Sequence, residues 1–241
     1  MLPMLLESGL TLLVLFGATL TASTFGFGGA LFSMPLLTLV VGIEVAIPLY
    51  GLVGWTTALM VMGTSWREAK LRLVWRLMLG TLVGIPLGVV LVRHLPSPLL
   101  VQGLGIFLIA FGLYRLLALP VPPLYRLSWA YLFGLIAGVL GGAYNTGGPP
   151  VVVYATMNRW PPETFRATLQ STFLVTGLGV LISHGVGGLW TEQVLRLFVL
   201  SVPVVVPAVW LGAWLNRHMP MHQFERLLFL ILMVLGVMLF L

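Results

Sequence analysis

Polar residues gather at two glycine-rich breaks in an otherwise apolar chain. The first break is residues 26–29 (GFGG), and the second is residues 145–148 (NTGG), which two prolines follow. A helix that begins at such a break presents backbone N–H groups without helical partners and about half a positive charge. Glycines allow a ligand to approach that backbone closely. Two such helix starts facing each other would bind a small anion without a buried Lys or Arg.

A second set of polar residues is divided between two other apolar stretches. Thr56 and Thr57 occur in one, and Thr172 and Thr176 occur in the other beside Gln170. A threonine in a helix often only bonds the carbonyl four residues earlier. Each of these hydroxyls therefore has two alternative roles, helix packing or ligand binding. An amide in a bilayer needs partners, and that of Gln170 is expected to reach the break or the ligand. The candidate binding residues are Ser23, Thr24, Gly28, Gly29, Asn145, Thr146, Gly147, Gly148, Gln170 and Ser171.

Other glycines are interpreted as packing positions. They recur at four-residue spacing, which is typical of closely crossing helices in a bilayer. We interpret the Asn145–Thr146 pair differently, as the cap of a helix that begins near Gly148. The packing glycines are Gly80, Gly84, Gly88, Gly134 and Gly138.

Ionisable residues near the apolar stretches lie at the predicted ends of those stretches. His184 has the chemistry to carry a coupling proton, but a lone histidine at a membrane interface is more simply a bystander. The sequence contains no HExxH motif, paired inner carboxylates, Ser-His-Asp set or P-loop. We therefore expect no enzymatic activity, no cofactor and no metal site. The ionisable residues concerned are Glu44, Glu163, Arg166, His184 and Arg196.

Composition identifies the environment in which these residues act. Of 241 residues, 59% are hydrophobic and 7% are charged, whereas soluble domains carry about 25% charged residues. Apolar runs near twenty residues recur along the chain, as bilayer-spanning helices require. The twelve Lys and Arg residues occur singly between apolar runs, so no clustered basic face for nucleic acid is expected. The sequence predicts an all-α polytopic membrane protein with the lipid bilayer around it.

Ten apolar segments are predicted, and eight are long enough to cross a bilayer. The two short ones, 30–42 and 148–157, follow the glycine-rich breaks and are expected to be half-length helices within the membrane. Ten of the twelve cations fall on one side of the alternating topology, which places both termini outside the cell. The segments are 8–25, 30–42, 45–63, 73–92, 97–118, 127–143, 148–157, 164–184, 193–215 and 223–241.

An internal duplication relates the two halves of the chain. Residues 87–96 recur at 211–220 with six of ten positions identical. Five segments per half is an odd number, so the second copy enters the membrane from the opposite side. The prediction is an inverted repeat of two five-segment halves, 1–119 and 127–241, joined by a short cytoplasmic linker at 120–126. Inverted repeats with broken helices are typical of secondary transporters, in which one half rocks against the other.

Glycine and proline motifs along nearly the whole chain resemble those of the TauE/SafE family of membrane permeases. They are residues 25–30 (FGFGGA), 34–36 (MPL), 141–142 (GG) and 147–150 (GGPP), with Pro161-Pro162 and Arg166 downstream. The resemblance implies movement of sulfite or an organosulfonate, usually export. From the residues themselves, only a small anion near two helix starts is expected.

The function expected from these observations is secondary transport of a small anion across the cell membrane by alternating access. An anion channel of the same architecture and a non-transporting membrane subunit are the alternatives. The sequence leaves open the transport direction, the coupling proton or ion, and the oligomeric state.

Overall fold

The structure is a computed structural model that describes residues 2–62, 71–117, 126–160, 162–218 and 221–240. Within these ranges it describes the side chains of residues 6–61, 74–117, 126–160, 172–216 and 229–240. The described residues form ten helices and no strand, which confirms the all-α prediction. The helices are α1 (Leu2–Phe25), α2 (Gly29–Val41), α3 (Ile43–Met62), α4 (Leu71–His94), α5 (Ser97–Leu116), α6 (Trp129–Tyr144), α7 (Gly148–Met157), α8 (Pro162–Val186), α9 (Glu192–His218) and α10 (Met221–Met238).

Each helix coincides with one predicted segment, and the two short segments are short helices. Helix α2 has 13 residues and α7 has 10, about 20 Å and 15 Å of helix. Within the described ranges, five helices (α1, α3, α4, α5 and α9) are long and apolar enough to cross a membrane by length and composition. This is fewer than the eight expected. Helix α6 has only 16 residues, and α8 and α10 have side chains outside the description.

The outer surface of the bundle is apolar, as a bilayer requires. Val83, Val199 and Trp210 are 64%, 67% and 74% exposed. A water-soluble helix would turn such side chains toward a core and present charged residues instead. The interior is equally apolar, with Leu15 and Met34 fully buried in the main core. The bundle is therefore hydrophobic both on its outer surface and in its interior, which is the pattern of a multi-pass membrane protein.

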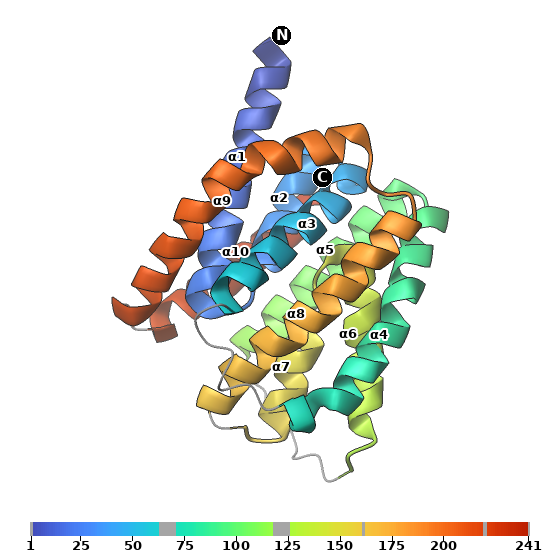
Figure 1. Ribbon diagram of the computed structural model, residues 1–241, viewed down its shortest axis with the longest axis vertical. Coiled ribbons are helices and arrows are strands. Elements are labelled where there is room, and N and C mark those ends of the chain that lie inside the picture. The colour runs from blue at the N-terminus through green and yellow to red at the C-terminus, as the bar shows by residue number, and fades with distance from the viewer. Residues whose placement is uncertain (1, 63–70, 118–125, 161, 219–220, 241) are drawn as a thin grey trace.

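The two halves of the sequence interlock instead of forming separate bundles. Helix α1 of the first half packs against α9 of the second, and α4 of the first half packs against α6 of the second. Helices α5 and α10 pack together, as do α3 and α8. Figure 1 shows α9 running beside α1, and α4, α6 and α8 together on the other side of the bundle. These exchanged pairs are what an inverted repeat would require, and the repeat and its boundaries stay a prediction.

Helices α4 and α6 lie in backbone contact because glycines face each other. A Cβ atom added at Gly84 would collide with the carbonyl oxygen of Leu135, and one added at Gly138 would collide with that of Thr81. Gly88 likewise lies against the carbonyl oxygen of Val139. The packing role predicted for these glycines is confirmed, since small residues let two helices approach closely.

Two predicted connections lie outside the described residues. The connection that carries Arg67 and Lys70 lies in residues 63–70, and the linker predicted at 120–126 falls almost wholly in residues 118–125. Both chain ends lie in the upper part of the view in Figure 1.

Candidate functional site

The first glycine-rich break ends α1 and begins α2 with backbone alone. Gly26 and Gly28 have φ angles of 81° and 91°, in the left-handed region that favours glycine. No side chain caps α2, whose first backbone bond runs from the Phe32 N–H to the Gly28 carbonyl over 3.0 Å. The three preceding N–H groups, on residues 29–31, therefore have no helical partner. This helix start is a cluster of backbone donors without a helical partner.

The second break is held by side chains. Asn145 adopts the left-handed conformation with φ 56° at the C-terminus of α6. Its Nδ2 donates to the Ile47 carbonyl oxygen on α3 over 2.7 Å. The Thr146 hydroxyl donates to the Leu140 carbonyl over 3.4 Å. Helix α7 begins at Gly148, as predicted, but no side chain caps it. The expectation that Asn145 or Thr146 caps α7 is wrong, because both side chains bind elsewhere.

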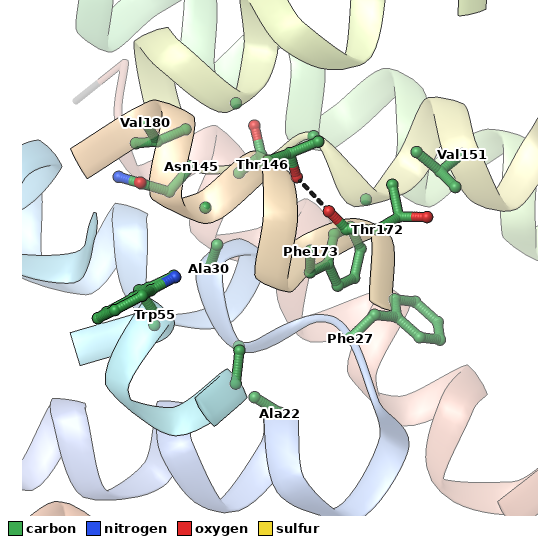
Figure 2. A pocket seen from close by; sticks show the side chains of 18 of the residues that line it. Ala22, Phe27, Ala30, Trp55, Asn145, Thr146, Val151, Thr172, Phe173 and Val180 are labelled. Carbon is green, nitrogen blue, oxygen red and sulfur yellow. Dashed lines mark hydrogen bonds between the residues drawn. The ribbon is translucent and has the colours of Figure 1, made fainter. Parts of the chain in front are cut away.

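Both helix starts open onto one cavity. Gly28, Gly29, Asn145, Thr146, Gly147 and Gly148 all line it. Its volume is about 140 Å³. A single water molecule needs about 10–15 Å³. Figure 2 shows Asn145 and Thr146 on one side of the cavity and Ala30 and Trp55 on the other. The cavity therefore has room for a small anion between α2 and α7.

Two of the other predicted site residues, Ser23 and Thr24, do not line this cavity. Ser23 and Thr24 face α9, where a Cβ at Gly212 would lie 2.6 Å from that of Ser23. The Thr24 hydroxyl bonds the carbonyls of Leu20 and Gly212 at 2.7 and 3.3 Å. Hydroxyls at the end of α1 thus serve helix packing, since α1 turns that face toward α9. Gln170 and Ser171 lie in α8, and their side chains fall outside the description.

Aromatic residues that the sequence does not single out form much of the cavity wall. Trp55 on α3 donates from Nε1 to the Leu174 carbonyl on α8 over 3.2 Å, which ties the two helices together. The ring of Phe173 lies against the start of α7, 3.3 Å from a Cβ placed at Gly148. The hydroxyl of Tyr50 meets the start of α2 at Gly29. An aromatic residue in a wholly apolar helix carries no periodic signal that distinguishes a cavity wall from a lipid-facing surface.

Threonine hydroxyls in the wall are already engaged. Thr57 and Thr81 donate to the carbonyls four residues earlier, at 2.8 and 2.9 Å, and Thr176 does the same at 2.7 Å. Their hydroxyl hydrogens are therefore committed to the helices, and they offer the cavity acceptor oxygens. This supports the packing alternative for these hydroxyls.

The electrostatics of the cavity favour an anion. Its lining includes no Asp, Glu, Lys or Arg among the described residues. Two helix N-termini each contribute about half a positive charge. The two starts differ in hydrogen-bond donors, because residues 149 and 150 of α7 are prolines and lack an N–H. Among the first three residues of each helix, α2 has three N–H groups without helical partners, and α7 has one, that of Gly148.

One ionisable residue lies in an unexpected place. His184 is 0% exposed and contacts α6 through Gly142. The ring is buried against α6 and is not exposed at a membrane interface as the sequence predicts, although Ile182 and Val186 in the same turn are exposed. The described residues otherwise contain no group of three or more His, Cys, Asp or Glu able to hold a metal ion.

A family model described as "Sulfite exporter TauE/SafE" matches residues 11–239. The chain belongs to the TauE/SafE family. Neither the curated proteins nor the solved structures include a match. Membership makes the protein a multi-pass membrane transporter of the sulfite-exporter type, and not an enzyme. Both glycine-rich breaks lie within the matched residues.

Proposed function

We propose that this protein is a secondary transporter that carries sulfite or an organosulfonate across the cell membrane by alternating access. The observation that carries the proposal is that the starts of α2 and α7 line one cavity in the interior of a membrane transporter. Family membership supports a sulfur oxyanion as the substrate.

In this proposal the oxygens of the anion bind mainly at the start of α2. The N–H groups of residues 29–31 are directed along the helix axis and lack helical partners. Hydrogen bonds from such donors to an anion are stronger than those between neutral groups. Gly148 and the side chain of Asn145 complete the site from the opposite side. Phe27, Trp55 and Phe173 in the wall suit the organic part of a sulfonate.

The exchange of helices changes which parts would move. Since α4 is in backbone contact with α6, the first half cannot rock as a unit against the second. We propose instead that α4, α6 and α7 move together against α1, α2 and α9, with the cavity between them. Helix α3 packs against α1, α2 and α9, and α8 packs against α4, α6 and α7, so the contact between α3 and α8 connects the two bodies. In the same scheme both termini face outward.

The test is flux of sulfite, sulfoacetate and sulfate through the purified protein in liposomes. The proposal expects saturable uptake of sulfite or sulfoacetate and counterflow driven by unlabelled anion in the lumen. Flux that does not saturate and shows no counterflow would indicate a channel. The absence of flux and of binding for all three anions would overturn the proposal.

A further inference from the structure

His184 is a buried histidine whose tautomer the structure assigns. Its Nε2 lies 3.0 Å from the carbonyl oxygen of Gly142, in the last turn of α6. A carbonyl oxygen only accepts hydrogen bonds, so Nε2 carries the proton. In the neutral ring Nδ1 is then an unprotonated acceptor. This nitrogen is buried and has no hydrogen-bond partner among the described residues.

The unpaired nitrogen points toward the wall of the anion cavity. A Cβ placed at Gly51 would lie 3.1 Å from Nδ1 of His184 and 3.2 Å from Oδ1 of Asn145. Gly51 and Asn145 both line the cavity. His184 also continues the face of α8 that carries Thr176 and Val180, which line the cavity at four-residue spacing. The ring thus lies one layer behind the wall, and only a glycine and an amide side chain separate it from the cavity.

The dipole of α6 favours a positive charge on the His184 ring. The C-terminus of α6 is the negative end of a helix dipole and lies at Nε2. Oδ1 of Asn145 and Nδ1 of His184 both border Gly51. An unpaired buried acceptor costs free energy, and protonation of Nδ1 turns it into a donor.

No described charged side chain of the neighbouring helices competes for this role. The helices packed against α8 are α3, α4, α6 and α7. At the start of α3, Glu44 accepts a hydrogen bond from Ser97, and on α4 Arg76 lies over a tryptophan ring. The hydroxyl of Tyr50 lies at Gly29. The described ionisable residues of these helices are Glu44, Tyr50, Arg76, Arg93, His94, Tyr131, Tyr144 and Tyr154.

We propose that His184 binds the proton that is coupled to anion transport, and that this proton reaches Nδ1 from the cavity past Gly51 and Asn145. The inference rests on the proposed transport function. A hydronium ion that enters the cavity gives its proton to the Nδ1 lone pair and becomes water, and the ring becomes a cation that still donates Nε2–H to Gly142. The new Nδ1–H faces Gly51 and Asn145 at the cavity wall. The cation lies beside the anion site, so the proton and the anion stabilise each other and cross together. Return of the proton to water on the other side restores the neutral ring.

The test compares His184→Gln with His94→Gln in liposomes that contain the full chain. Glutamine can still donate to Gly142 but does not take up a proton. His94 is a matched control, because one of its ring nitrogens also contacts a helix carbonyl, with Nδ1 at 2.9 Å from that of Val90, yet the residue is exposed. Methanesulfonate is the probe, since it stays fully ionised and any effect of pH reports the protein.

The expected results separate coupling from transport. Wild type and His94→Gln accumulate methanesulfonate on the alkaline side of an imposed pH gradient. His184→Gln accumulates at least about tenfold less methanesulfonate under the same pH gradient. It still exchanges methanesulfonate across the membrane when the pH is equal on both sides. Anion affinity of the wild type rises about tenfold from pH 8 to pH 5, within the usual range of coupling between two ligands, and is flat in His184→Gln. Equal accumulation by His184→Gln and wild type would overturn the proposal.

Two further outcomes are decisive. A wild type that exchanges the anion but ignores the pH gradient overturns the coupling proposal and leaves transport standing. A wild type that neither binds nor moves any anion overturns both. In case His184→Gln does not fold, His94, His218 and His222 are changed to Gln so that His184 is the only histidine. Nitrogen NMR is then expected to show protonation of Nδ1 between pH 8 and pH 5 with methanesulfonate present. A ring that stays neutral over that range contradicts the proposal.

Discussion

The starts of α2 and α7 border the same cavity but are built in opposite ways. The α2 start follows glycines with positive φ and carries three backbone donors without helical partners. The α7 start carries two prolines in its first turn, and the break before it is held by the side chain of Asn145. One start is rich in donors, and the other contributes a helix dipole and a fixed amide. The comparison indicates that an anion site between two helix ends need not share its hydrogen bonds equally.

The largest effect is expected from adding a methyl group at Gly29, the first residue of α2. At Gly29 a Cβ would meet the Tyr50 hydroxyl, the Ala18 carbonyl at 2.7 Å and the Ala22 Cβ at 2.8 Å. Gly29→Ala should therefore displace the α2 start and cost about 1–3 kcal/mol of stability. Sulfoacetate affinity, measured by equilibrium binding, should fall by about thirtyfold or more.

Gly148→Ala is the matched control, because its Cβ would contact only a Phe173 ring atom, at 3.3 Å. It should change the melting temperature and the affinity little. An equal loss in the two variants would remove the distinction between the two starts.

The next largest effect is expected from exchanging the donors. Ala30→Pro makes the α2 start read Gly-Pro, as α7 does, and removes one N–H at a position where proline is tolerated. Pro149→Ala adds an N–H to α7. Because a hydrogen bond to a charged group contributes about 1.5–3 kcal/mol, Ala30→Pro should weaken anion binding by about tenfold or more.

Pro149→Ala should leave binding unchanged or strengthen it a few-fold. Calorimetric titration with sulfoacetate measures both variants. Weaker binding by Pro149→Ala together with unchanged binding by Ala30→Pro would reverse the assignment of the donors.

A smaller effect is expected at Asn145. Asn145→Gly keeps the left-handed backbone and removes the amide, so anion affinity should fall by about fivefold. Asn145→Ala removes the same amide and also strains the backbone, so it should lower stability by about a further 1 kcal/mol. Thermal unfolding in detergent separates the two variants. Unchanged affinity in both would exclude Asn145 from the anion site.

The smallest effect is expected from the wall threonines. Thr57→Val and Thr176→Val remove hydroxyls whose hydrogens already bond helix carbonyls. Affinity for sulfite should change less than about threefold in each variant, since little donor capacity is lost. A loss of more than tenfold in either variant would show that a hydroxyl turns toward the anion when it binds.

Sequence reasoning works well here where the signal lies along the chain. The lengths of the apolar runs predict all ten helices, and the glycines predict where α2 and α7 begin. It fails where the signal depends on which way a helix faces. Ser23 and Thr24 are near the break, but their helix turns them toward Gly212. Because the helices are apolar on every side, periodicity does not indicate that Trp55 and Phe173 form the cavity wall.

The role of Asn145 could not be predicted for a related reason. Its amide binds Ile47, which is 98 residues away in sequence, so only the tertiary structure reveals that bond. The burial of His184 depends in the same way on α6. Local patterns thus predict helix ends, and long-range packing decides which side chains reach the cavity.

The most direct measurement is the position of a bound anion. Selenite is a selenium analogue of sulfite that anomalous scattering locates, and it meets no thiol in this chain because the sequence has no cysteine. The account predicts one strong peak between α2 and α7, with oxygens within about 3 Å of the Gly29 and Ala30 nitrogens and fewer contacts at Gly148. A peak outside this cavity, or one bound at α7 with none of the α2 nitrogens in reach, would contradict it.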